Sequence, residues 1–262
     1  EEYYTQALTM YRKVYGEEKN YKGIADALWG LANVKSHYKI YQDAERKYLQ
    51  SLSIYKEIRG QISNKELGAL LANLASTYKN MCKYENADSY YKQSLAMYRQ
   101  QYGVHSNHED IANILNNIGL VCRYRNMFSD AEDYYVESLE IYRSIHADDG
   151  DHAHIASLLN RLGFMYNETK KYQRAEYYFE AALSMYKTIH GEDSFHKDIA
   201  IMLGNLAKTF YEMRKYDKSE EYLTRALAMY RQIHGEDSNH EDIVRILKGL
   251  VFHYGKLGDK EK

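Results

Sequence analysis

Apolar residues recur at three- and four-residue steps along most of the chain, with polar residues at the positions between them. In the stretch 107–127 this spacing joins Ile111, Leu115 and Ile118, which therefore share one face of an expected helix. A second helix is expected over about 129–145. Its inward face is predicted to carry Ala131, Tyr134, Tyr135, Leu139 and Tyr142. The pattern thus predicts a pair of amphipathic helices joined by a short turn.

This helix pair is repeated. The segment HEDIANILNNIG, which begins at His108, returns as HAHIASLLNRLG from His152, as HKDIAIMLGNLA from His196 and as HEDIVRILKGLV from His240. The equivalent apolar positions fall 44 residues apart, with one step of 43 residues, at Ile24, Leu67, Ile111, Ile155, Ile199 and Ile243. A fixed period of this length is the signature of a repeat array.

The period divides the chain into one expected array over 1–262. Residues 1–23 supply the second helix of a preceding repeat. Full repeats follow at 24–66, 67–110, 111–154, 155–198 and 199–242, and residues 243–262 supply the first helix of a partial repeat. Small residues recur where the helices of a pair cross, at Ala32, Ala75, Gly119, Gly163 and Ala207. Because one pair cannot bury its apolar face alone, we expect an all-α fold in which the pairs stack into a solenoid.

Cap signals mark the ends of these helices. A serine followed by glutamate three residues later predicts a capping box at Ser63/Glu66, Ser106/Glu109 and Ser238/Glu241. Glycines are expected to end the second helix of each pair in a left-handed conformation, at Gly60, Gly103, Gly191 and Gly235.

Composition narrows the possible partners. The chain of 262 residues has 35 basic and 37 acidic residues, a net charge of −2, and no proline. This balance argues against a nucleic-acid or anionic-membrane partner, since either favours a concentrated basic surface. No apolar run approaches the roughly 20 residues that cross a bilayer, and no signal peptide is recognised. Cys82 and Cys122 are expected to be buried apolar residues in a reducing compartment, and we expect a cytoplasmic protein.

The recurring histidines could either bind a metal ion or only pack and hydrogen-bond at the helix starts. His108, His152, His196 and His240 recur once per period. Stacked helix pairs place them on the order of 10 Å apart, too far to share an ion. We therefore predict packing or hydrogen bonding at each helix start, with no metal and no cofactor. The acidic run at Asp148, Asp149 and Asp151 lacks the glycine and terminal glutamate of a calcium loop and is expected to be solvated. No motif for catalysis is found, so a non-enzymatic protein is predicted.

The segment LANLASTYKNMCKYENADSYYKQSL, at 71–95, resembles the tetratricopeptide repeat, with signature residues at Leu74, Ala75, Tyr78, Tyr84, Ala87, Tyr91 and Ser94. The longer period and the run 203–243 resemble the kinesin-light-chain subgroup, although the junction between repeats is two residues longer here and its proline is replaced. The resemblance implies a right-handed superhelix whose first helices line a concave groove. It also favours a short acidic peptide as the ligand.

Carried onto this chain, the resemblance places polar residues of the first helices in that groove. They are Trp29, Asn33, Asn73, Lys79, Asn80, Asn113, Asn116, Asn117, Arg123, Asn160, Arg161, Asn167, Asn205, Lys208, Tyr211, Arg245 and Lys248. The asparagines either tie neighbouring helices together or pair with the backbone of an extended peptide. The cations make the groove locally positive, which favours an acidic segment of a protein partner.

Two other functions are kept open. Such arrays also follow a nucleotide-binding switch in signalling proteins, so the chain could be the ligand-sensing, regulatory part of a larger protein. The first helix repeats the interior pattern at Tyr3, Tyr4, Leu8 and Tyr11, and the chain begins with Glu1. This indicates either a piece of a longer array or a structural protein that associates end to end.

Overall fold

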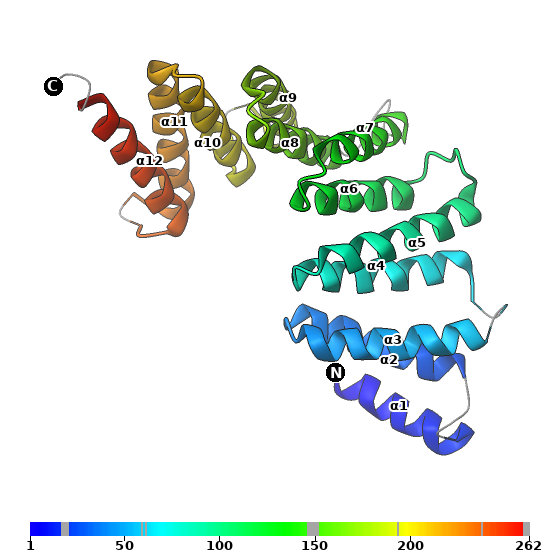
Figure 1. Ribbon diagram of the computed structural model, residues 1–262. Coiled ribbons are helices and arrows are strands. Elements are labelled where there is room, and N and C mark those ends of the chain that lie inside the picture. Colours follow the sequence, from blue (N-terminus) through cyan, green and yellow to red (C-terminus); the bar gives the residue numbers. More distant parts are fainter. Residues whose placement is uncertain are drawn as a thin grey trace. The chain divides into compact units, whose positions relative to one another are not determined.

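The structure is a computed structural model that describes residues 1–16, 21–58, 60, 62–145, 152–192, 194–236 and 238–258, all in helices and short connections (Figure 1). The acidic run at 148–151 lies outside the described residues. The twelve helices of this part are α1 (Glu2–Tyr15), α2 (Lys22–His37), α3 (Tyr41–Glu57), α4 (Asn64–Asn80), α5 (Tyr84–Tyr102), α6 (Glu109–Tyr124), α7 (Phe128–Ile145), α8 (His152–Glu168), α9 (Tyr172–His190), α10 (Lys197–Glu212), α11 (Tyr216–His234) and α12 (Glu241–Gly258). No described helix has the length and apolar character needed to cross a bilayer.

The chain forms two units, Glu1–Ile141 and Tyr142–Lys262. In the first unit α2 packs on α3 and α4 on α5, while contacts of α3 with α4 and of α5 with α6 join successive pairs. In the second unit α8 packs on α9 and α10 on α11, and α9–α10 and α11–α12 contacts continue the stacking. The prediction of an all-α solenoid of helix pairs is confirmed.

A large ring set against a small residue joins the two helices of a pair. A Cβ atom added to Gly119 of α6 would lie 2.8 Å from the ring of Tyr135 on α7. One added to Gly163 of α8 would lie 2.6 Å from the ring of Phe179 on α9. Both rings are fully buried. The first helix therefore leaves room for the aromatic ring of the second, as the recurring small residues predicted.

Buried serines add a polar link within three pairs. The hydroxyls of Ser51, Ser94 and Ser138 donate to backbone carbonyl oxygens of the partner helix over 2.7–2.8 Å. All three side chains are fully buried. A buried hydroxyl is costly unless it is hydrogen-bonded, so these bonds explain how a polar residue occupies a helix crossing.

The N-terminal ends of the helices confirm one of the predicted capping boxes and contradict the other two. The capping box at Ser63 and Glu66 is confirmed. At α6 and α10, however, the N-caps are His108 and His196, whose Nδ1 atoms accept the backbone N–H two residues ahead over 3.1 and 3.3 Å. His240 accepts from Asp242 in the same way at α12. The predicted boxes at Ser106/Glu109 and Ser238/Glu241 are therefore wrong, because each helix begins after the histidine.

The predicted glycines cap α5, α9 and α11, at Gly103, Gly191 and Gly235, whereas α3 ends earlier with Ile58 as its C-cap. Gly60, Gly103, Gly191 and Gly235 have φ angles between 92° and 102°. The turns between the first and second helices also require a left-handed residue, but here it is not glycine: Lys39, Cys82, Asn126, Lys170 and Arg214 have φ angles of 58–62°. Cys82 is consequently exposed in a turn, which corrects its predicted burial, whereas Cys122 is buried as expected.

The close packing of Tyr135 on Gly119 predicts that a glycine-to-alanine substitution destabilises the fold there, whereas the same substitution at the open position Gly255 stabilises it. Gly119→Ala should lower the free energy of unfolding by about 1–3 kcal/mol, because the new methyl group overlaps the Tyr135 ring. Gly255→Ala on α12 meets no heavy atom within 4 Å and should raise it by up to about 1 kcal/mol through helix propensity. Urea denaturation of both variants measures this, and a gain at Gly119 would contradict the packing.

The left-handed turns predict a stabilising substitution. Lys170→Gly should raise the free energy of unfolding by up to about 1 kcal/mol, because the left-handed conformation is costly for an L side chain and the greater freedom of glycine in the unfolded chain offsets only part of that gain. Asn126→Gly, in the equivalent turn, should gain less because asparagine tolerates this conformation. Thermal unfolding with both variants provides the comparison, and a loss of stability in Lys170→Gly would refute it.

Candidate functional site

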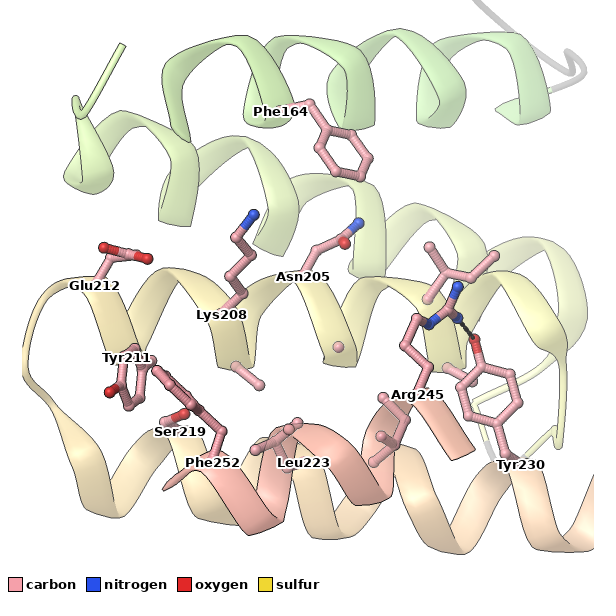
Figure 2. Close-up of a pocket in the computed structure, with 16 residues that line it drawn as sticks. Phe164, Asn205, Lys208, Tyr211, Glu212, Ser219, Leu223, Tyr230, Arg245 and Phe252 are labelled. Atoms are coloured by element: carbon pink, nitrogen blue, oxygen red, sulfur yellow. Dashed lines mark hydrogen bonds between the residues drawn. The ribbon is translucent and has the colours of Figure 1, made fainter. Parts of the chain in front are cut away.

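A cavity of about 590 Å³ lies in the second unit, among α8, α10, α11 and α12 (Figure 2). We call it the α10–α12 cavity. Its lining residues are Phe164, Ala200, Ile201, Gly204, Asn205, Ala207, Lys208, Tyr211, Glu212, Ser219, Leu223, Tyr230, Arg245, Ile246, Gly249 and Phe252. Its volume falls in the range of small-ligand and side-chain pockets, and most of its lining side chains are apolar.

Three lining positions of the cavity carry residues smaller than those in most other repeats. Leu223 stands in the α11 position that holds an aromatic ring in the other pairs, at Tyr48, Tyr91, Tyr135 and Phe179. Gly204 aligns with larger residues in the other repeats, such as Trp29 and Asn116, and Gly249 aligns with larger residues in most of them, such as Asn73, but with Gly30 in the first. Leu223, Gly204 and Gly249 all line the cavity, so their small size contributes to its space.

The two ends of the cavity differ in chemistry. Figure 2 shows Tyr211 and Phe252 together at one end and Arg245 with Tyr230 at the other. The Tyr211 and Phe252 ring centroids are 5.4 Å apart, and the Phe252 side chain remains 56% exposed. A large apolar group that enters this end would cover an aromatic surface that water now contacts.

At the charged end of the cavity, hydrogen bonds hold the Arg245 side chain in place. Arg245 donates to the Tyr230 hydroxyl over 3.1 Å and to the Asp242 carboxylate over 2.9 Å. Burial raises the pKa of Tyr230, so its hydroxyl stays protonated. Burial alone would also raise the pKa of Asp242, but the hydrogen bond from Lys197 and the charge of Arg245 more than offset it, so this pKa is lowered. Asp242 therefore remains ionised and holds Arg245 in place.

Lys208 and Ser219 are the polar groups of the cavity without a partner among the described residues. Lys208 is exposed on α10 and projects on the side that faces Phe164 in Figure 2. Ser219 is 1% exposed, and its hydroxyl has no hydrogen-bond partner. The equivalent positions in the other repeats are alanines, such as Ala131 and Ala175. An unpaired buried hydroxyl is costly, so a ligand that accepts from it gains a hydrogen bond that the free protein lacks.

The predicted groove residues of the second unit divide into two groups. Asn205, Lys208, Tyr211 and Arg245 line the cavity. The others, Asn160, Arg161, Asn167 and Lys248, do not. Within this unit the amide of Asn205 donates to Asn160 over 3.2 Å, and that of Asn167 donates to Thr209 over 3.0 Å. These asparagines tie neighbouring first helices together, which is one of the two roles that the sequence left open.

In the first unit the same tie joins α2 to α4, where the amide of Asn73 donates to Asn33 over 3.1 Å. Asn33 also accepts from the Tyr48 hydroxyl over 2.6 Å. Asn117 instead bonds within its own helix, to the carbonyl oxygen of Asn113. The remaining predicted residues of this unit, Trp29, Lys79, Asn80, Asn116 and Arg123, lie on the same three helices, α2, α4 and α6.

Phe164 and Phe252 line the cavity but were missed by the sequence analysis. They occupy the first-helix position held by Asn33 and Lys208 in other repeats, so the repeat register places them on the predicted groove face. The search for polar groove residues passed over them because they are apolar. An aligned repeat that shows a phenylalanine at a polar position is the signal that could have found them.

Comparisons with known proteins agree with this fold. Two family models, both described as tetratricopeptide repeat, match the chain, one over residues 66–144 and 198–262 and the other over residues 155–196. No curated protein matches the chain.

Several solved structures share the arrangement of helices. BtubC (BKLC) from P. vanneervenii is 22% identical, with a TM-score of 0.72 over 91% of this chain and 92% of that protein. A putative kinesin light chain from Podosopora anserina with nearly identical TPR-like repeats is 17% identical, with a TM-score of 0.65 over 81% of this chain and 98% of that protein. The apo form of the quorum sensor NprR from B. thuringiensis is 15% identical, with a TM-score of 0.63 over 92% of this chain but only 62% of that protein. The chain therefore belongs to the tetratricopeptide repeat family, and its helix pairs share the fold of the repeats in kinesin-light-chain-like proteins.

Proposed function

We propose that this chain is a protein-interaction module that holds an extended, acidic segment of a partner protein, with one large apolar side chain of that segment in the α10–α12 cavity. Tetratricopeptide repeats form protein-interaction or regulatory domains, and the proposal specifies the ligand and its place on this chain. The observation that carries it is an open, mainly apolar cavity beside the exposed Lys208. The function is one of binding, and no catalytic role is assigned to any residue.

The cavity offers an apolar space for one large side chain of the peptide and an unpaired lysine for one of its carboxylates. Burial of one large apolar side chain contributes roughly 1.5–3 kcal/mol, which favours an aromatic or large aliphatic residue between Phe164 and Phe252. Lys208 has no ionic partner among the described residues, so a peptide carboxylate can pair with it without displacing an existing ion pair. Arg245 is already held by Asp242 and contributes less new charge.

A regulatory role is the second candidate, and one observation favours it. The quorum sensor NprR has the same fold over 92% of this chain, while this chain spans only 62% of NprR. A domain of this kind in a larger protein would alter the activity of its neighbour when the ligand binds. The two roles share the binding site and differ in whether occupancy changes the behaviour of an attached domain.

Replacement of the unpaired Lys208 by glutamate should weaken the binding of an acidic peptide. Peptides selected from a random displayed library against the chain should be enriched in Asp and Glu beside a large apolar residue. Lys208→Glu should bind such a peptide about three- to tenfold more weakly, because an exposed attractive pair becomes repulsive. Fluorescence anisotropy measures the affinity.

Lys13→Glu on α1 makes the same charge change at another exposed lysine and should bind as the wild type does. Equal affinity in both variants would exclude Lys208 from the site.

Filling the cavity should block binding more severely. Gly204→Trp places a tryptophan at the position that Trp29 occupies in the first pair, so the repeat accommodates this residue. We expect a loss of at least about tenfold in affinity, because the new side chain occupies the space of the ligand. Ala72→Trp makes the equivalent change in α4 of the first unit and should leave affinity unchanged. Binding that survives Gly204→Trp, in a variant with a wild-type circular dichroism spectrum, would overturn the assignment to this cavity.

A further inference from the structure

Three junctions between a second helix and the next first helix, α5–α6, α9–α10 and α11–α12, stack a ring on a histidine that caps the following helix. The last turn of the second helix supplies Tyr102, His190 or His234. Each of these rings stacks on the histidine N-cap of the following helix, with centroids 3.5, 3.4 and 3.6 Å apart. An aspartate two residues after the N-cap completes each cluster, at Asp110, Asp198 or Asp242.

At the junction of α9 and α10 the cluster is His190, His196 and Asp198. The His190 Nε2 atom lies 3.3 Å from Asp198 Oδ2, and His196 Nδ1 lies 3.4 Å from the same oxygen. One donor atom from each residue falls within 4.8 Å of the other two. The side chains are 22%, 39% and 40% exposed, so an ion can reach them from solution.

The other two junctions differ in the groups that matter for a cation. At the junction of α5 and α6, Tyr102 replaces the first imidazole, and its hydroxyl donates to Asp110 over 2.8 Å. At the junction of α11 and α12, the Asp242 carboxylate is already paired with Lys197 over 3.2 Å and with Arg245 over 2.9 Å. Asp198 has no lysine or arginine partner among the described residues. Of these three junctions, the middle one alone joins two imidazoles to a carboxylate that no cation neutralises.

We propose that His190, His196 and Asp198 form a binding site for a divalent transition-metal ion such as Zn²⁺. Two imidazoles and a carboxylate are ligands that Zn²⁺ accepts, at about 2.0–2.2 Å. Tetrahedral ligands at that radius lie roughly 3.3–3.5 Å from one another, close to the 3.3 Å between His190 Nε2 and Asp198 Oδ2. Three protein ligands leave a fourth position for water or for a group of a partner protein.

Ion binding requires one change of side-chain conformation. The rings of His190 and His196 lie within 16° of parallel, so their in-plane lone pairs do not meet at one point. The more exposed His196 ring must turn about its Cβ–Cγ bond to face the ion. That turn gives up its hydrogen bond from the Asp198 backbone N–H, an N-cap interaction worth about 1 kcal/mol. The site therefore couples metal binding to the start of α10, a helix that lines the α10–α12 cavity.

The chain provides its own control variants. His190→Tyr copies the Tyr102 junction, so the stacked ring and the hydrogen bond to the carboxylate are retained while a metal ligand is removed. His234→Tyr makes the same substitution at the junction where the carboxylate is already neutralised. Both variants should fold as the wild type does, which circular dichroism checks.

The test is the uptake of Zn²⁺ by the chain in chelator-free buffer, measured by isothermal titration calorimetry and by metal analysis after gel filtration. His190→Tyr should bind one ion fewer per chain than the wild type, or bind it more than about a hundredfold more weakly, since loss even of a supporting group costs up to that factor. His234→Tyr should match the wild type. Unchanged uptake in His190→Tyr, or an equal loss in His234→Tyr, would overturn the proposal.

Discussion

The close approach of a small residue on one helix to a large ring on the next is the interaction on which this structure depends. Gly119 beneath Tyr135 and Gly163 beneath Phe179 leave no room for a Cβ atom. The pairing fixes the spacing of the two helices and aligns each pair for stacking on its neighbour. A helix pair has too little apolar surface to be stable alone, so its stability comes from repetition of this contact. Buried tyrosines suit such thin layers: the rings of Tyr48 and Tyr78 are buried, while their hydroxyls donate to Asn33 and Glu45.

The candidate binding site arises where that interaction is relaxed. Leu223 replaces the ring of the other pairs, and glycines at 204 and 249 stand where most of the other first helices carry larger residues. Function is thus proposed at a departure from the repeat rather than in the repeat itself. The same holds for the histidine junctions, where charge rather than geometry distinguishes Asp198 from Asp242.

Much of the fold could be predicted from the sequence because the repeat multiplies each weak signal. The helix pairs, the small residues at their crossings and the glycine caps recur in register, and the structure has them. Two N-caps were mispredicted because the Ser-x-x-Glu pattern is local, whereas His108 caps α6 and also stacks on Tyr102 of the preceding helix. The cluster at His190 was missed for a related reason. Histidines were compared one period apart, whereas the structure brings together two that are six residues apart across a loop.

The central claim is that a ligand segment binds at the α10–α12 cavity, and amide chemical-shift mapping tests it most directly. Addition of a library-selected acidic peptide to isotope-labelled protein should shift the amides of α10 and of the first half of α12 most, with smaller changes along α8 near Phe164. Such a pattern places the peptide against the residues that form the cavity. Shifts confined to α2, α4 and α6 of the first unit, with α10 and α12 unchanged at saturation, would contradict the account.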